Sequence, residues 1–212
     1  MEISSAEGKG KKGAQSRRKV VEAARELFVA FGYSGTSMSD IAKAAGVNKS
    51  LIYHHFESKD QLWNEILFSI TDHFLQSQRN CFNNPQDYSA DFVRDLLRIS
   101  FTYLSEHPEM VRMYMWANME DRRLKSNKLE SAERWVYVQI MLENIRRAQN
   151  AGSLRDDVPP LHIFQFLMGS MSFWFQTKER RERMVLVPAE DNIDENYLNS
   201  LIKLFFQGVL PK

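Results

Sequence analysis

The sequence predicts an all-α protein of about nine helices. Apolar residues recur at intervals of three and four, the spacing of an amphipathic helix, in stretches such as Leu62, Ile66, Leu67, Ile70 and Phe74. Four of the six prolines stand between such stretches. No segment shows the sustained alternation of apolar and polar residues that marks strands joined by hairpin turns. With 43% hydrophobic residues, the 212-residue chain can bury the cores of one or two domains.

Start and stop signals define the helices of the N-terminal third. Residues whose side-chain oxygen caps a helix precede three of them: Ser37, Asn48 and Ser58. Asp40 follows Ser37 at the spacing of a capping box. Gly32 and Gly46 follow the ends of two helices, where glycine is favoured because it adopts positive φ. The four helices expected here are Ser16–Phe31, Met38–Ala45, Lys49–Phe56 and Lys59 to about Asn80.

The same signals predict five later helices and a division into domains. The later helices are expected at Ser89–Glu106, Pro108–Met119, Lys128–Ala151, Pro160–Arg183 and Ile193–Val209. We expect a flexible basic arm over residues 1–14, a three-helix domain over 15–60, and a larger helical domain over 61–212.

Two short helices meet at Ala45, Gly46 and Val47, a pattern typical of a helix-turn-helix, because glycine permits the sharp turn. The side chains expected to pack between them are Ile41, Ala42, Ala45, Val47, Ile52 and Phe56. The outward face of the second helix carries no acidic residue; its members are Lys49, Ser50 and His54, with Leu51 and Tyr53 at the edge. Such a face fits the major groove of DNA. The alternative is a tight helical corner with a solvated basic surface.

Residues 37–62, SMSDIAKAAGVNKSLIYHHFESKDQL, resemble the DNA-binding signature of the tetracycline-repressor (TetR/AcrR) family, as does the preceding RRKVVEAARELFVAFGYSGTS. The resemblance covers about the first 65 residues, and the rest of the chain resembles the family in its helix count. It implies a homodimeric repressor. The N-terminal domain would bind double-stranded DNA at a palindromic operator, and the C-terminal domain would bind a small-molecule effector.

The resemblance also implies which residues contact DNA. Candidates for base or groove contact are Lys49, Ser50, Leu51, Tyr53 and His54, and candidates for phosphate contact are Ser37, Ser39, Tyr53, His55 and Lys59. Lysine reaches guanine O6 and N7, serine serves either base type, and tyrosine or histidine donates to phosphate oxygens. Leu51 departs from the family pattern, which often has a small or hydroxyl residue there. It either contacts a thymine methyl group or packs against its neighbours.

The net charge of +1 conceals an uneven distribution, with +3 in residues 1–60 and −2 in residues 61–212. Between Gly8 and Lys19 there are six basic residues and no acidic one. This composition predicts a segment that is disordered when free. The segment either adds attraction to phosphates and the minor groove or serves only as a solubilising tail.

Methionine and aromatic residues are abundant in the C-terminal part, for example between Met110 and Met119. Most such stripes form a core, although adaptable methionines and flat aromatic rings also line cavities for apolar ligands. Candidates for lining an effector pocket are Trp116, Met119, Tyr137, Met141, Met171 and Trp174. The effector expected from them is small and largely apolar.

The last two helices are expected to pair with those of a second copy in a four-helix bundle, as the resemblance implies. Gly169, Ser170 and Ser172 permit close approach within one apolar helix, and Leu201, Leu204 and Phe205 give the other an apolar stripe. The alternative is packing within one chain.

Other function classes find little support. None of the five histidines has a glutamate three residues before it, as a helical di-iron site requires, and no HExxH, Walker A or GxSxG motif occurs. We therefore predict no enzyme activity, catalytic residue, metal or cofactor. A structural DNA-binding protein would lack an effector cavity. The single cysteine, Cys81, and the lack of an apolar window of about 20 residues favour a cytoplasmic protein with no membrane partner.

Overall fold

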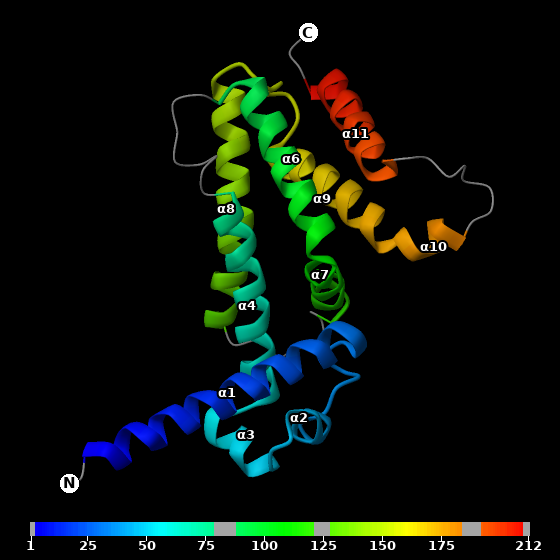
Figure 1. The fold of residues 1–212 in the computed structure, drawn as a ribbon. Coiled ribbons are helices and arrows are strands. Elements are labelled where there is room, and N and C mark those ends of the chain that lie inside the picture. Colours follow the sequence, from blue (N-terminus) through cyan, green and yellow to red (C-terminus); the bar gives the residue numbers. More distant parts are fainter. Residues whose placement is uncertain (1–2, 79–87, 121–127, 184–191, 210–212) are drawn as a thin grey trace. The chain divides into compact units, whose positions relative to one another are not determined.

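The computed structural model describes residues 3–78, 88–120, 128–183 and 192–209; the side chains of 3–12, 90, 128–137, 182 and 209 are not described. Over these ranges the protein is all-α, with ten helices and no strand, which confirms the predicted fold class. The helices are α1 Ile3–Phe31, α2 Met38–Ala45, α3 Lys49–His55, α4 Lys59–Ser77, α6 Ala90–Glu106, α7 Pro108–Glu120, α8 Lys128–Asn150, α9 Pro160–Gln176, α10 Lys178–Arg183 and α11 Ile193–Val209 (Figure 1).

Helix α1 begins earlier than expected. The sequence predicts a flexible arm over residues 1–14, whereas α1 begins at Ile3. No proline interrupts this segment. Adding residues to an existing helix avoids the cost of nucleation, so the helix that residues 16–31 form can extend through the basic segment.

The helix expected at Pro160–Arg183 is divided into α9 and α10 at Thr177, which has φ −93° and ψ 4°. Side chains there bind carbonyl groups in the last turn of α9. The Thr177 hydroxyl donates to the Phe173 carbonyl at 2.8 Å, and the Arg181 guanidinium donates to the Trp174 carbonyl. These bonds satisfy carbonyl groups that a helix end leaves unpaired.

The chain forms two compact units. The first comprises Met1–Ile70 and Arg112–Glu130, and the second comprises Thr71–Val111 and Ser131–Lys212. Helices α4 and α7 therefore contribute residues to both units. This division differs from the expected boundary between residues 60 and 61, because the first half of α4 and the end of α7 complete the core of the first unit.

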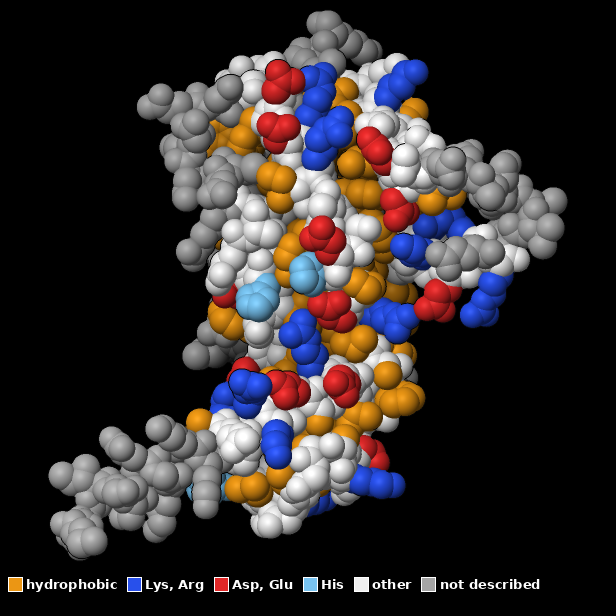
Figure 2. Space-filling model, in the orientation of Figure 1, with side chains coloured by type: hydrophobic (Ala, Val, Ile, Leu, Met, Phe, Trp, Pro, Cys, Tyr) orange, Lys and Arg blue, Asp and Glu red, His pale blue; other side chains and the backbone are white. Residues whose placement is uncertain are grey.

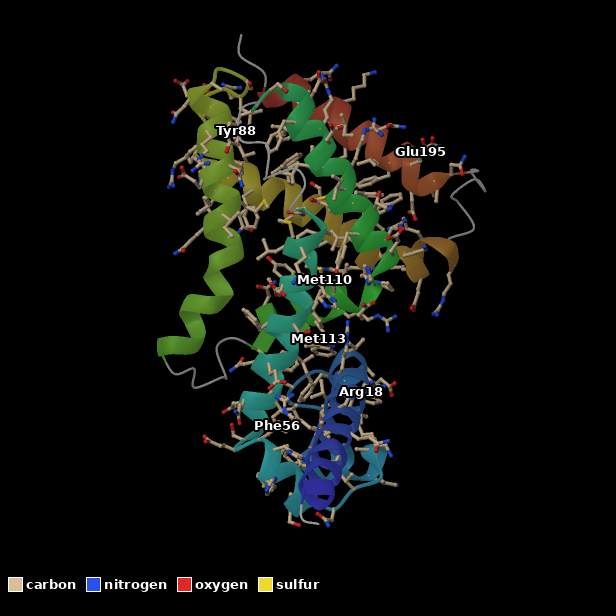
Figure 3. The ribbon with its side chains drawn as sticks, turned by 60° about the vertical axis from the view of Figure 1, so that its left-hand side comes forward. Arg18, Phe56, Tyr88, Met110, Met113 and Glu195 are labelled. Carbon is tan, nitrogen blue, oxygen red and sulfur yellow. The ribbon has the colours of Figure 1, made fainter. Side chains whose placement is uncertain are left out.

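Aromatic and aliphatic side chains from α1, α2, α3 and α4 fill the core of the first unit. Phe28 and Trp63 are fully buried and meet edge to face, with ring centroids 5.0 Å apart. Phe56, just after α3, is 1% exposed (Figure 3). Of the side chains expected to pack at the turn, four are buried and two, Ala45 and Val47, are half-buried; the buried ones are Ile41, Ala42, Ile52 and Phe56.

In the second unit, α6 packs against α9 and α11. The centroid of the buried Phe101 ring lies 4.7 Å from the centroid of the Phe175 ring and 6.1 Å from that of the Tyr197 ring. Lys and Arg side chains gather over α10 (Figure 2). Among the helices described, none is long and apolar enough to cross a membrane. Within the same ranges no three His, Cys, Asp or Glu side chains are grouped to hold a metal ion.

Candidate nucleic-acid interface and effector cavity

The turn between α2 and α3 has the geometry that the sequence predicts. Gly46 is left-handed, with φ 65° and ψ 34°, and the following amide of Val47 donates to the Ala42 carbonyl at 3.0 Å. The Asn48 side chain then caps α3 by accepting from the Leu51 amide at 2.8 Å. The chain therefore reverses over two residues and starts the new helix at a defined position.

The predicted capping box at the start of α2 is present. The Asp40 amide donates to Ser37 Oγ at 3.2 Å, and the Ser37 amide donates to Asp40 Oδ2 at 3.0 Å. Hydrogen bonds from the side chain and backbone of Ser37 hold the pKa of the Asp40 carboxyl below its ordinary value. Ser39, the second residue of the helix, is exposed. Both predicted phosphate contacts of α2 thus lie on its solvent-facing first turn.

Helix α3 turns one side into the core and the other to solvent. Ile52 is fully buried, whereas Tyr53 is 48% exposed. The remaining exposed side chains are Lys49, Ser50 and His54, and Leu51 is half-buried. The Lys49 ammonium lies 5.9 Å from the centroid of the Tyr53 ring. The predicted base-contacting residues therefore share one surface that is basic and aromatic and has no carboxylate within α3.

His55 faces α1. Its Nε2 lies 3.0 Å from the Ser16 hydroxyl. Burial, with smaller effects of His54 and Arg17, lowers the pKa of His55, so the neutral ring is favoured. The contact fixes the end of α3 against α1. The sequence predicted His55 only as a phosphate contact and did not predict this structural role.

Lys59, a further predicted phosphate contact, is bonded within the first unit. Its ammonium donates to the carbonyls of Tyr33 and Thr36, each at 2.9 Å, and lies 3.9 Å from the centroid of the Tyr33 ring. Burial lowers its pKa. Two of the three N–H groups of the ammonium are thus used to hold the start of α4 against the α1–α2 loop.

Two residues of α7 complete this corner. Glu120, 6% exposed, accepts from the backbone amide and the hydroxyl of Ser34, both at 2.9 Å. The Trp116 indole donates to the Val29 carbonyl at 3.2 Å. A Cβ added to Gly32, where φ is 70°, would lie 2.7 Å from the Trp116 ring. No local pattern reveals these contacts, because Ser34 and Glu120 are 86 positions apart.

Arg17 is also engaged, although the sequence places it in the basic segment. Its guanidinium binds both carboxylate oxygens of Glu65 at 2.6 Å and lies 5.0 Å from the centroid of the Phe56 ring. This ion pair, in which the single nitrogen Nη2 contacts both oxygens, joins α1 to α4. Arg17 therefore supports the position of α3, whereas Arg18 is 81% exposed on α1.

The second unit contains a cavity of about 50 Å³ between α6, α8, α9 and α11. Its walls are almost entirely apolar: Phe92, Val93, Leu96, Leu97, Ser100, Met141, Asn144, Ile145, Leu154, Ile163, Phe164, Leu167, Met168, Met171 and Phe205. Met141 and Met171 are among the residues expected to line an effector pocket. No charged side chain lines it among the described residues.

The other pocket candidates do not line this cavity. Trp116 packs in the first unit, and Met119 is 59% exposed. The Trp174 ring is stacked on the Tyr197 ring, with 3.8 Å between the two centroids. The Arg181 guanidinium lies 3.5 Å from the centroid of the Trp174 ring. The Trp174 ring is therefore in contact with both of these side chains. The side chain of Tyr137 lies outside the described residues.

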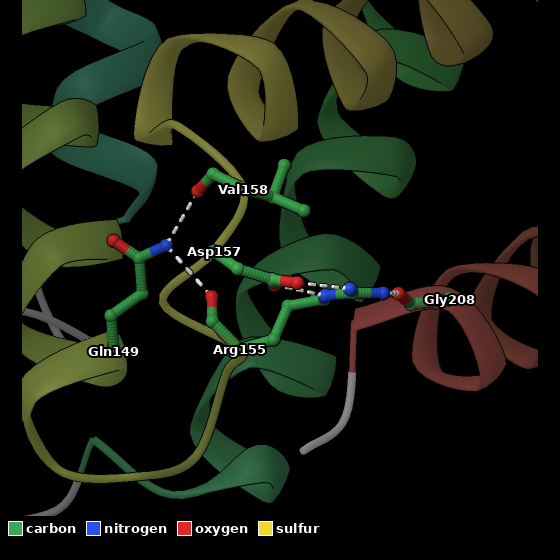
Figure 4. Close-up of polar contacts among 5 residues, drawn as sticks. All are labelled: Gln149, Arg155, Asp157, Val158 and Gly208. Atoms are coloured by element: carbon green, nitrogen blue, oxygen red, sulfur yellow. Dashed lines mark hydrogen bonds and ion pairs between the residues drawn. The ribbon is translucent and has the colours of Figure 1, made fainter. Parts of the chain in front are cut away.

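The loop before α9 closes one side of the cavity through Leu154. The Gln149 side chain donates to the carbonyls of Arg155 and Val158, each at 2.8 Å (Figure 4). Arg155 pairs with Asp157 and donates to the Gly208 carbonyl of α11 at 3.1 Å. These bonds tie the loop to α8 and α11 and hold the cavity wall in place.

A capped helix-turn-helix with a carboxylate-free outer helix, joined in one chain to a helical unit with an apolar cavity, defines a DNA-binding regulator. Residues 20–66 match the family model described as "Bacterial regulatory proteins, tetR family", and residues 94–198 match "Tetracyclin repressor-like, C-terminal domain". The chain belongs to the tetracycline-repressor (TetR) family. It is a ligand-responsive, DNA-binding transcriptional regulator and not an enzyme.

Individual relatives agree with this assignment. The chain is 28% identical over 164 residues to the HTH-type transcriptional repressor KstR2 of Rhodococcus jostii, a match that spans 74% of this chain and 76% of the relative. It resembles the crystal structure of a TetR family regulator from Marinobacter aquaeolei, with a TM-score of 0.73, 19% identity, and coverage of 95% and 99% of the two chains. FadR from Bacillus subtilis, solved in complex with stearoyl-CoA, gives a TM-score of 0.65, 16% identity, and coverage of 91% and 98%.

Proposed function

We propose that this regulator represses transcription as a homodimer at a palindromic operator and leaves DNA when a small, largely apolar effector binds. The proposed base contacts come from α3: Lys49, Ser50, Leu51, Tyr53 and His54. The observation that carries the proposal is the outer face of α3, which exposes a lysine, a tyrosine and a histidine without a carboxylate. A face of this kind can approach the anionic major groove closely.

The proposed phosphate contacts surround α3 and differ in how free they are. They are Ser37, Ser39, Tyr53, His55 and Lys59. Ser39 and Tyr53 are exposed, whereas His55 and Lys59 already have partners inside the first unit. We propose that these two act mainly by positioning α3 and the α1–α2 loop, and that Lys59 offers its third N–H to one phosphate.

The proposed dimer interface lies on α9 and α11. Leu161, Phe166 and Phe173 of α9 are 46%, 51% and 66% exposed, and Leu204 of α11 is 65% exposed. Phe166 and Phe173 are seven residues apart and thus share one face of the helix. A groove of about 230 Å³ runs beside Phe166 and Leu204. Exposed apolar side chains gathered in this way favour burial against a second copy.

A dimer of this type presents the two copies of α3 to DNA at a separation of one helical turn, about 34–36 Å, or a whole number of turns. This spacing matches a two-fold symmetric site. Release requires only that the effector prefer a dimer arrangement in which this spacing does not fit DNA. A difference of about 1–3 kcal/mol in effector affinity between the two arrangements changes DNA affinity roughly 5- to 150-fold.

The test is selection of bound sequences from a random duplex pool with the full-length protein. We expect enrichment of one two-fold symmetric site. Lys49→Ala should weaken binding to that site and reduce the slope of log affinity against log salt by about 0.9 for each phosphate that Lys49 neutralises, or by less if Lys49 binds only bases. The control is Arg146→Ala, which removes the same charge from an exposed side chain of α8. Failure to enrich any site would overturn the proposal.

A further inference from the structure

The first turns of α1, residues 3–15, extend past the end of α3 and are called the α1 extension below (Figure 1). Ser16, the next residue, has its hydroxyl 3.0 Å from Nε2 of His55, the last residue of α3. At about 1.5 Å per residue, the extension spans roughly 20 Å beyond this contact. The matched family model begins at residue 20, so the extension lies outside the domain that the chain shares with it.

One face of α1 continues from the core of the first unit into the extension. Val20 and Ala24 are fully buried, and Ser16, one turn before Val20, meets α3. Residues three, four or seven positions apart share a face of a helix. Positions 12 and 9, four and seven residues before Ser16, therefore continue the face that contacts α3. Both positions are occupied by lysine.

The opposite side of α1 also carries two basic residues. At about 100° per residue, positions 11 and 18 lie roughly 140° and 160° around the helix from Ser16. They are occupied by Lys11 and Arg18. Arg18 is 81% exposed and pairs with Glu22 at 3.1 Å. The two pairs, Lys9 with Lys12 and Lys11 with Arg18, thus carry equal charge on opposite sides of one helix.

The end of α3 is where a DNA backbone would lie. A helix of seven residues is about 10 Å long, and the major groove is about 12 Å wide, so a helix seated in the groove ends close to a wall of sugar and phosphate. The contact between Ser16 and His55 places α1 at that end of α3. The face of the extension that holds positions 9 and 12 is therefore continuous with the side of the domain that would meet this wall.

Two cations near this end of α3 are already used within the first unit. Arg17 binds the Glu65 carboxylate at 2.6 Å, and Lys59 donates to two backbone carbonyls at 2.9 Å. His55 favours its neutral form, since burial lowers its pKa. The extension adds lysines close to the phosphates at this end of α3, where these three residues contribute little free charge.

We propose that the α1 extension binds the DNA phosphates that flank the half-site contacted by α3, through Lys9 and Lys12. This inference rests on the proposed binding of DNA by α3 and extends the contact beyond the helix-turn-helix. Contacts between lysine and phosphate carry no direct sequence information. The extension therefore raises affinity for all sequences alike, and its contribution falls as salt rises.

The test compares two double variants of the full-length protein. Lys9→Gln with Lys12→Gln removes two charges from the proposed contact face, and Lys11→Gln with Arg18→Gln removes two from the opposite side. Glutamine has nearly the helix propensity of lysine and arginine, so neither change unwinds α1. Affinity is measured by fluorescence anisotropy across a salt series, on a labelled duplex of arbitrary sequence about 30 base pairs long, or three helical turns.

The expected result follows from counterion release. Each lysine–phosphate contact contributes about 0.9 to the slope of log affinity against log salt, so the Lys9 and Lys12 variant should lower the slope by about 1.8 for each protomer bound. The affinity that it loses relative to the native protein should shrink about twelvefold between 50 and 200 mM salt. The Lys11 and Arg18 variant should change the slope by less than about 0.5. Equal effects of the two variants would overturn the inference and indicate a tail that attracts DNA without a defined face. An unchanged slope in both would overturn it and indicate a solubilising tail.

Hydroxyl-radical footprinting on an enriched operator locates the contact. The native protein should protect the backbone outside each half-site, and the Lys9 and Lys12 variant should lose this outer protection while it keeps the protection within the half-sites. Absence of outer protection with the native protein would contradict the inference.

The outcome is separable from that of the proposed function, because the salt series uses DNA of arbitrary sequence. An enriched symmetric site, together with equal slopes for the two variants, would refute only the role of the extension. A lower slope for the Lys9 and Lys12 variant alone, with no enriched site, would refute only the operator proposal. No binding of DNA by the native protein would overturn both.

Discussion

The buried carboxylate of Glu120 provides a direct test of how the first unit holds its α1–α2 loop. Glu120→Gln keeps the shape of the side chain and removes its charge. In the native protein this carboxylate accepts from the Ser34 amide through both oxygens, at 2.9 and 3.2 Å, and from the Ser34 hydroxyl at 2.9 Å. Glutamine retains one acceptor oxygen and places an NH₂ group where the second was.

The magnitude follows from the change in hydrogen-bond type. Bonds to a charged acceptor contribute about 1.5–3 kcal/mol and neutral ones about 0.5–1.5 kcal/mol, so each of the two principal bonds loses about 1 kcal/mol. Because Glu120 is only 6% exposed, water cannot replace the missing interactions. We expect the free energy of unfolding to fall by about 2 kcal/mol.

The assay is urea denaturation of the full-length protein, followed by circular dichroism and by tryptophan fluorescence, since Trp63 and Trp116 both lie in the first unit. The control is Glu26→Gln on the exposed surface of α1, which should change stability by less than about 0.5 kcal/mol. If Glu120→Gln is no more destabilising than Glu26→Gln, the reasoning that Glu120 anchors the loop is refuted.

Three further predictions concern the turn, the α1–α3 contact and the dimer. Gly46→Ala should lower the free energy of unfolding by about 1–2 kcal/mol in thermal denaturation, because φ is 65°, a conformation that alanine disfavours. Nothing lies within 4 Å of the added Cβ, so a steric clash does not contribute. An unchanged stability would show that the left-handed turn is dispensable. The pKa of folded His55 is below its ordinary 6.5, so the unfolded chain takes up the proton first as pH falls. The free energy of unfolding should therefore decrease as pH falls below about 6.5 and level off below the pKa of the folded state. In urea denaturation at a series of pH values, the His55→Gln variant should lack the part of this decrease that His55 causes. An identical pH profile for the variant and the native protein would contradict the assignment. Phe173→Arg, at a position 66% exposed, should convert the proposed dimer to monomer in analytical ultracentrifugation, and a persisting dimer would place the interface elsewhere.

The features that the sequence predicted correctly are local. The capping box of Ser37 and Asp40, the Asn48 cap and the left-handed Gly46 each involve residues no more than four positions apart. Their geometry depends on backbone sterics and short hydrogen bonds, which residue type alone largely determines. The exposed face of α3 was also predictable, because helical periodicity assigns Ile52 to the core and Tyr53 to solvent.

The prediction of pocket residues from the sequence was less accurate, because the same residue types occur in cores, pockets and exposed surfaces. The sequence predicted Trp116, Met119 and Trp174 as pocket residues from their apolar character, yet only the tertiary structure distinguishes a ring packed on α1, an exposed thioether and a stacked indole. The division of α9 from α10 at Thr177 depends in part on Arg181, whose side chain reaches back to the Trp174 carbonyl.

Periodicity and capping signals were sufficient to predict the all-α class, nearly every helix, the helix-turn-helix and the surface that α3 presents. The packing of the helices, and no local pattern, places Lys59 against the carbonyls of Tyr33 and Thr36, places Glu120 against Ser34, and surrounds the cavity with mostly apolar side chains and no cation among the residues described. The reason is the range of the interactions. Helix periodicity and capping act within a few residues, whereas the contacts of Lys59 and Glu120 join positions 23 to 86 apart, whose approach depends on how the helices pack.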